Sequence, residues 1–182
     1  VYNNGVFHAV NSTIASNESF GIYMTDSTLV RAELFNTIVA SNRGVDIWQG
    51  DYATLTGFHC LIGNGDWQAG VFTNTHIGTT EDPHEPFADP DSSDFRLLEG
   101  SLASDSGATA LAVYPDATPI TSDLSGDPRI QNASVDMGAF EGAVYIPGQI
   151  YVVNSLGLEI AAGDGVLTLP EALAASNRNQ TV

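Results

Sequence analysis

The chain has 182 residues, of which 22 are acidic and only five are basic, so its formal net charge is −17. All five cations are Arg, and a surface of this charge repels phosphate backbones and anionic membranes. Because no apolar run of 18 residues is present either, the composition predicts no nucleic-acid partner and no membrane insertion. The single cysteine, Cys60, excludes an internal disulfide and is typical of a small buried hydrophobic residue.

A short phrase is repeated near the start of the chain. Residues 11–17 read NSTIASN, and residues 36–42 read NTIVASN 25 positions later. A looser third copy occupies residues 58–64, at an offset of 22 to 24 positions. Repetition with a period of roughly 20–50 residues is typical of solenoids, propellers and arrays.

Each copy is rich in Ile, Val and Thr, which favour strands, and is followed by Asn and Gly, which favour turns. Helical apolar spacing is not sustained over three turns anywhere, so helical repeats are not expected. We predict an all-β fold, a right-handed parallel β-helix (solenoid) whose coils stack at roughly 4.8 Å. The predicted strands are residues 6–10, 13–15, 21–24, 29–34, 37–40 and 46–48.

Stacked coils place equivalent residues above one another. Ile14 and Val39 are expected to stack in the interior by this logic. Asparagines at equivalent turns are expected to share side-chain amide hydrogen bonds in a structural ladder. The ladder residues are Asn11 with Asn36 and Asn17 with Asn42.

Residues 63–94 are dense in Gly, Pro, Asp and Thr, and the repeat region is expected to end at about Asn64. We interpret residues 81–86 and 89–94 within this stretch as long acidic loops that leave the coil. Clustered carboxylates suit Ca²⁺, and the weak candidates are Asp89, Asp91 and Asp94; no other cofactor is predicted. The alternative is a soluble acidic surface. His84 lies between two carboxylates, but a single loop His is far more often exposed than bound to metal.

Residues 95–141 contain several phrases that place Asp beside Gly or Ser, which is typical of Asx-turns. Their acidic residues are expected to pair with Arg96 and Arg129, in a structural rather than a catalytic role. We assign residues 1–141 to the coils and a closing segment, and residues 142–150 to a linker.

Residues 151–182 are predicted to form a strand and one short capping α-helix. Thr168 and Glu171 fit a capping box at the start of that helix. A helix at the end of a solenoid covers open strand edges, so this segment either opens the next repeat or docks on a neighbour. The residues assigned to this assembly segment are Tyr151, Val153, Leu169 and Leu173.

These phrases in order resemble the choice-of-anchor Q proteins, a bacterial family of right-handed parallel β-helix surface proteins related in style to the polymorphic outer-membrane proteins. After the two asparagine phrases, the resemblance rests on DFRL, DSG, GDPR and VDMGAFE, and it covers nearly residues 8–141. Residues 150–177 resemble the cap that opens the same β-helices, with Pro170 in place of the family's Arg. The family pattern more often has Asn at Cys60, which predicts one missing rung in the ladder. The resemblance implies a surface location and several domains, and no chemistry.

The closing phrase of one β-helix therefore precedes the opening cap of another. This order indicates a unit of a tandem array, or a subunit that completes its neighbour, and both remain open. Our first hypothesis is a structural or adhesive repeat module of an extracellular bacterial surface protein or filament. Its partners are copies of itself, assembled head-to-tail.

Two other hypotheses concern polysaccharides. Tyr23 and Trp48 share the 25-residue offset and would form an aromatic platform for sugar binding, unless their rings fill the coil or cover its flank. A lyase or hydrolase would use Asp46 with Asp51 or Asp66, because paired carboxylates cleave glycosidic bonds. The chain has no Lys to act as the strong base that a lyase needs, and no catalytic residue is assigned.

Overall fold

The computed structural model describes residues 1–67, 70–78 and 86–144. Over these residues the chain is all-β, and its first half forms three parallel sheets of four strands each. Sheet A contains β1 (Tyr2–Asn3), β4 (Ile22–Met24), β7 (Ile47–Gln49) and β10 (Gly65–Asp66). Sheet B contains β2 (Val6–Val10), β5 (Arg31–Phe35), β8 (Thr54–Phe58) and β11 (Gly70–Thr73). Sheet C contains β3 (Thr13–Ile14), β6 (Ile38–Val39), β9 (Leu61–Ile62) and β12 (His76–Ile77).

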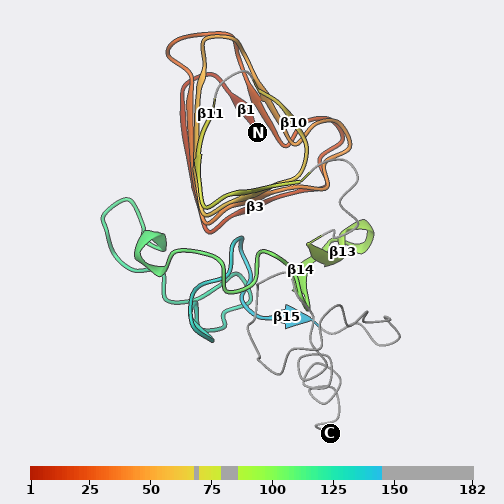
Figure 1. Cartoon of the computed structure of the whole chain (residues 1–182), viewed down its shortest axis with the longest axis vertical. Helices are drawn as coiled ribbons and strands as arrows, with labels where there is room; N and C mark the ends of the chain where they lie inside the picture. The colour runs from red at the N-terminus through yellow and green to blue at the C-terminus, as the bar shows by residue number, and fades with distance from the viewer. Residues whose placement is uncertain (68–69, 79–85, 145–182) are drawn as a thin grey trace, which may run out of the picture.

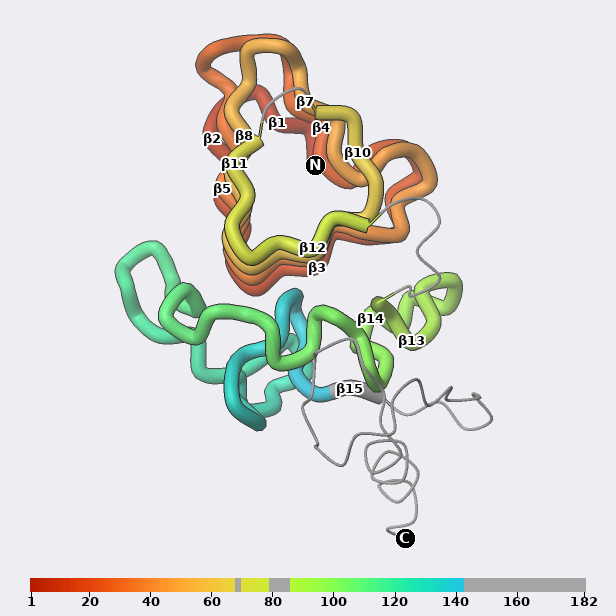
Figure 2. Tube along the Cα trace, viewed as in Figure 1, coloured from red at the N-terminus to blue at the C-terminus, as the bar shows by residue number. Residues whose placement is uncertain are grey.

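The chain visits the three sheets in rotation. Each pass, which we call a coil, adds one strand to every sheet, so coil 1 is β1–β3 and coil 4 is β10–β12. Figures 1 and 2 show these coils stacked around a triangular outline. The arrangement is compatible with the predicted β-helix, and the predicted strand over residues 6–10 is confirmed to the residue.

The 25-residue repeat is the pairing register of coils 1 and 2. Ile14 pairs with Val39, as the repeated phrase predicts. The offset falls to 23 between Val39 and Ile62, and to 15 between Ile62 and Ile77. The repeats therefore extend beyond residue 64, because residues 65–66 and 70–77 form coil 4. The offset is short mainly because only residues 63–64 join sheet C to sheet A before coil 4, against residues 15–21 and 40–46 before coils 2 and 3.

The interior of the coils is an apolar core, because alternate side chains of each short strand point inward. Met24, Leu34 and Ile47 are fully buried there. In coil 4 the rings of Trp67 and Phe72, 5.8 Å apart and tilted, pack against this core.

Residues 86–144, which we call the closing segment, cover the outer face of sheet C (Figure 2). The segment contains an antiparallel pair, β13 (Phe87–Asp89) and β14 (Asp94–Leu98), and β15 (Ala143–Val144), which is parallel to β14. A second buried cluster joins the two layers. It consists of Ile38, Ala40 and Leu61 from the coils and Phe87, Leu97, Ala103 and Met137 from the closing segment.

Within the described ranges the helices are two short 3₁₀ turns, η1 (Pro90–Ser92) and η2 (Thr109–Leu111). The described helices include none long and apolar enough to cross a membrane. The predicted capping helix, most of the predicted linker, His84 and all four assembly residues lie outside the described residues.

Candidate functional site: a corner ladder and a buried arginine

The corner between sheets B and C has the same unusual backbone in every coil. Asn11, Asn36, His59 and Asn74 follow the sheet B strands and have positive φ angles of 43°, 47°, 52° and 48°. Asn and His tolerate this left-handed conformation better than most residues. We call these four residues the corner ladder.

The next residue in each coil supports the turn. Ser12, Thr37 and Thr75 donate from the side-chain hydroxyl to the carbonyl two residues earlier, at 2.8, 2.9 and 3.1 Å. Cys60 does the same with its Sγ, 3.4 Å from the Phe58 carbonyl oxygen. Cys60 thus occupies the hydroxyl position, and the prediction that it replaces a ladder asparagine is wrong: the ladder residue of coil 3 is His59. Burial raises the pKa of the Cys60 thiol to about 11.

Corner-ladder side chains bind the backbone of the closing segment. Asn36 Oδ1 accepts from Ala108 N at 2.7 Å, and Asn36 Nδ2 donates to Ala108 O at 3.0 Å. His59 Nδ1 lies 3.0 Å from the carbonyl oxygen of Ser106. That carbonyl requires a donor, so Nδ1 carries the proton and Nε2 accepts from Asn74 Nδ2 at 3.0 Å. The ladder therefore fixes the closing segment across successive coils.

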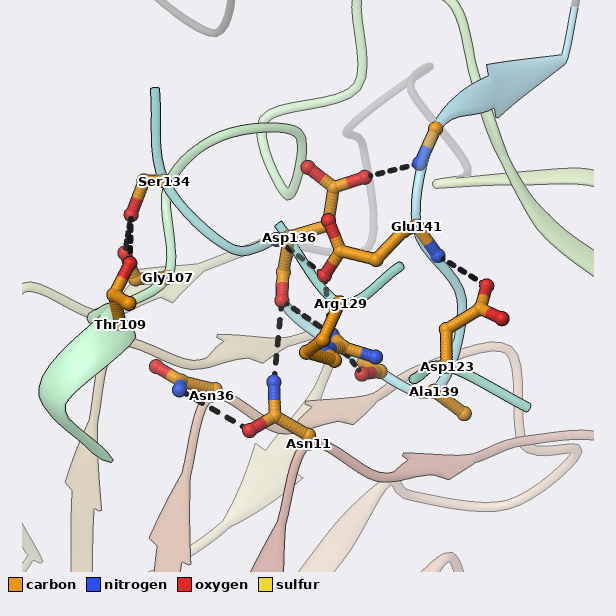
Figure 3. Close-up of polar contacts among 12 residues, drawn as sticks. Asn11, Asn36, Gly107, Thr109, Asp123, Arg129, Ser134, Asp136, Ala139 and Glu141 are labelled. Carbon is orange, nitrogen blue, oxygen red and sulfur yellow. Dashed lines mark hydrogen bonds and ion pairs between the residues drawn. The ribbon is translucent and has the colours of Figure 1, made fainter. Parts of the chain in front are cut away.

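Arg129 lies at the centre of the polar cluster in Figure 3, with only 2% of its surface exposed. Its Nη2 donates to the carbonyl oxygens of Asp136 and Gly138 at 2.8 and 2.9 Å, and lies 2.8 Å from a carboxylate oxygen of Glu141 in an ion pair. Carbonyl and carboxylate acceptors together compensate for burying a guanidinium. The loop that holds Met137 against sheet C is thus tied to Arg129 from both sides.

Asn11 connects this cation to coil 1. With its amide oxygen turned toward Arg129, it accepts from Nη2 at 2.8 Å and from Nε at 3.2 Å. In the opposite orientation, drawn in Figure 3, Asn11 Nδ2 makes a long 3.5 Å contact to Asp136 O and Asn11 Oδ1 lies 3.3 Å from Asn36 Nδ2. The first orientation is favoured because a guanidinium only donates hydrogen bonds.

The carboxylates around Arg129 are held by backbone N–H groups. Asp136 accepts from the N–H groups of Asp105 and Gly142 at 2.6 and 2.8 Å, and Glu141 accepts from the N–H of Asp136 at 2.9 Å. Burial raises the pKa of Glu141 to about 8; Asp136 adds to the rise and Arg129 opposes it. Burial also raises the pKa of Asp136 and lowers that of Arg129. All these contacts lie within the chain, so the cluster fastens the closing segment to the coils.

The expected amide hydrogen bond between Asn11 and Asn36 is not formed in the favoured orientation of Asn11, whereas the second predicted pair, Asn17 with Asn42, forms it. Asn17 Nδ2 donates to Asn42 Oδ1 at 2.7 Å, and Asn42 Nδ2 donates to Asp46 Oδ1 at 2.6 Å. The other oxygen of Asp46 accepts from Asn64 N at 2.7 Å, and the side chain is buried. The amide row therefore continues into the carboxylate of Asp46, for which only a catalytic role was predicted.

Tyr23 and Trp48 are brought together as a face-to-face stack, with ring centroids 4.5 Å apart and planes 7° from parallel. Tyr2 extends the stack at 5.4 Å and 13°. Rings that bind a sugar side by side must present their faces to solvent, whereas these faces cover one another. Tyr2, which is 70% exposed, is the terminal ring of the described stack.

The three calcium candidates do not form a metal-binding group, although Asp89 and Asp94 are paired across β13 and β14. Asp89 accepts from Ser92 N at the start of η1, and Asp94 holds Arg96 through contacts of 2.8 and 2.5 Å. Asp91 is exposed. In the described part of the chain, no three His, Cys, Asp or Glu side chains are arranged to hold a metal ion. The predicted pairing of Arg96 and Arg129 with acidic residues is confirmed.

Comparison with known proteins finds no matching family model, no matching curated protein and no matching solved structure.

Sequence reasoning missed two corner-ladder residues, His59 and Asn74. A signal for Asn74 was present, because residues 74–77 read NTHI and repeat the pattern of residues 36–39, NTIV. His59 is harder to find, since neither it nor Cys60 matches the Asn-Ser or Asn-Thr pair of the other coils. The local sequence does not indicate which groups accept from Arg129, because they come from a loop with several acidic residues.

Proposed function

We propose that this chain is a structural module of an extracellular bacterial surface protein or filament, built as a right-handed parallel β-helix of the choice-of-anchor Q type. Three four-stranded parallel sheets, visited in rotation by short strands, support the β-helix. Right-handedness is the expected hand, because connections between parallel strands of one sheet are almost always right-handed. The family and the location rest on the ordered phrases of the sequence.

The observation that carries the structural role is the use of the buried polar groups. Asn36, Arg129 and Asp46 are all buried, and each directs its polar atoms at groups of the same chain. Arg129 lines an open pocket with Asn11 and Asp123, but its Nη2 is engaged within the chain, whereas a catalytic or binding site leaves polar atoms free and turned toward a cavity. The polar clusters in this chain hold the closing segment and the corners in place.

The polysaccharide alternatives find less support in the geometry. Asp46 has both carboxylate oxygens engaged by N–H donors, which leaves it poorly suited to act as a general acid or base. Both faces of the Tyr23 ring and one face of the Trp48 ring are covered by neighbouring rings. We therefore place structural stacking ahead of sugar binding or cleavage.

Head-to-tail assembly is part of the proposal, because coils 1 and 4 are the outermost coils of the three sheets among the described residues. Electron microscopy of native material from the source cells, with mass determination after denaturation, tests it. Filaments or a surface layer with this unit as repeat are expected. A denatured mass near 19.2 kDa then means separate subunits, and a much larger mass means a covalent array. A compact intracellular monomer would contradict the proposed function.

A further inference from the structure

The outer edge of coil 4 has the properties of an interaction surface. Its strands are the last in all three sheets, and among the described residues they pair on one side only. Residues 70–78 contain no Asp, Glu, Lys or Arg, although the chain carries a net charge of −17. Val71 and Ile77 are 62% and 46% exposed. Proteins normally protect a strand edge with charge, Pro or a bulge, and an unprotected edge favours pairing with another strand.

Coil 1 offers a matching edge at the other end of the same sheets. Its strands have two, five and two residues, against two, four and two in coil 4. It too carries exposed apolar side chains, with Tyr2 at 70% and Val6 at 64%. In the described parts of coils 2 and 3, by contrast, the large exposed apolar residues are Leu29 and Tyr52, which lie outside the strands.

The side chains that point inward from these two edges complement one another in size. The strand registers place Phe7 and Gly70 in one row across sheet B, and Ala9 and Phe72 in another. A second molecule stacked in continued register would therefore set each Phe against the smaller residue of its row. In coil 3 the same device already operates, because Gly57 pairs with Phe72 and a Cβ at Gly57 would lie 2.8 Å from that ring.

Sheet C gives the same result for an aliphatic row. Ile14, Val39, Ile62 and Ile77 follow one another in register, and Ile14 and Ile77 are its end members. Stacking a second copy would place its Ile14 on Ile77 and continue the buried row. Both ends of the row are less buried than its centre, where Val39 and Ile62 have no exposed surface.

We infer that the coil 4 edge of one molecule binds the coil 1 edge of a second copy by parallel strand addition, in continued register. This inference rests on the proposed head-to-tail assembly and specifies its interface. Main-chain hydrogen bonds across all three sheets supply the attraction, and the Phe–Gly, Phe–Ala and Ile–Ile contacts select the register. The contact is heterologous, so it generates linear stacks.

Cysteine crosslinking tests the polarity and the register together. His8 and Val71 lie in one outward row of sheet B, so the inferred contact places Val71 of one molecule beside His8 of the next. The variants His8→Cys and Val71→Cys are made separately in the full chain and treated with a short bis-maleimide, alone and mixed. The native Cys60 does not interfere, because it is buried and its thiol pKa is raised to about 11.

The mixture is expected to yield at least tenfold more crosslinked dimer than either variant alone. Thr54→Cys mixed with His8→Cys is the matched control, since Thr54 is exposed on the same sheet but belongs to coil 3; it is expected to give no dimer. Dimer from Val71→Cys alone would mean tail-to-tail contact and overturn the inference. A double variant combines Val71→Cys with a second cysteine within residues 145–182. A crosslink between these two cysteines of the same chain would also overturn the inference.

Failure of this inference and failure of the proposed function give different results. A full chain that assembles without the mixed crosslink overturns the inference alone. A folded chain that stays monomeric over a wide concentration range also overturns non-covalent head-to-tail assembly, whereas surface location is read separately in the source cells. An intracellular protein that still forms the mixed dimer overturns the extracellular role and keeps the interface.

Discussion

The side-chain amide of Asn36 forms both hydrogen bonds of a strand-like pair with the backbone of Ala108. Oδ1 accepts from the N–H at 2.7 Å and Nδ2 donates to the C=O at 3.0 Å. A buried corner residue of coil 2 thus replaces a missing backbone partner of the closing segment. The two layers are joined by side chains at this point.

Replacing Asn36 with Ala removes both partners of Ala108. Leaving two partly buried backbone groups unpaired is expected to lower the free energy of unfolding by about 2–4 kcal/mol, in addition to the left-handed strain of Ala. Asn74→Ala is the matched control, because Asn74 has almost the same φ angle, 48°, and an exposed contact to His59. It is expected to cost only about 1–2 kcal/mol. Urea denaturation measures both, and equal losses would contradict the role of the Ala108 pair.

Arg129→Met tests the buried cluster. The substitution leaves Glu141 and the carbonyl oxygens of Asp136 and Gly138 without their donor, and removal of one partner of a buried ion pair typically costs about 3–5 kcal/mol. Arg43→Met is the control, because Arg43 pairs with Glu18 at 2.7 Å on the exposed surface. Its effect is expected to stay within about 1 kcal/mol. If the two variants unfold at the same urea concentration, Arg129 does not fasten the closing segment.

The raised pKa of Glu141 predicts a pH dependence of stability. The folded-state pKa is about 8 and the ordinary value is 4.5, so folding favours the protonated side chain. The associated stabilisation is complete below pH 4.5 and is lost as the pH rises through about 8. The free energy of unfolding is therefore expected to fall between pH 5 and pH 9 by more in the wild type than in Glu141→Gln.

The glutamine variant is a suitable reference because its amide oxygen can still accept from Asp136 N and from Arg129. Acidic groups remote from Glu141 titrate alike in both proteins and cancel in the comparison. A wild type that gains stability relative to Glu141→Gln as the pH rises would show that attraction to Arg129 outweighs the cost of burial.

The coil register could be predicted from the sequence because it depends on local repetition. The copies at residues 11–17 and 36–42 share their spacing, so the pairing of Ile14 with Val39 follows directly. Coil 4 could not be predicted in this way. Its offset is only 15 residues, and it keeps just Asn74, Thr75 and Ile77 of the repeated phrase.

The contacts of the closing segment were less predictable, because they join residues far apart in the sequence. Pairing of Arg129 with acidic residues was expected, since the chain has few cations, but the choice of Glu141 depends on how the segment folds over sheet C. Asn11 lies 125 positions from Asp136. Its expected role in an asparagine ladder was incomplete, because its amide also faces Arg129.

The aromatic stack gives a test that separates structural stacking from sugar binding. Tyr23 lies between Tyr2 and Trp48, so Tyr23→Ala removes two stacked pairs and is expected to lower the free energy of unfolding by about 1–3 kcal/mol. Tyr52→Ala is the control, because Tyr52 is 65% exposed and lies in a corner loop. It is expected to change stability by less than about 0.5 kcal/mol.

Titration with soluble polysaccharides, followed by tryptophan fluorescence, completes this test. Neither the wild type nor Tyr23→Ala is expected to show saturable binding, because the ring faces that would contact a sugar lie against one another. The opposite pattern would be unchanged stability in Tyr23→Ala together with loss of a binding signal present in the wild type. That pattern would require the rings to separate and present their faces, and it would favour the carbohydrate-binding hypothesis over the structural one.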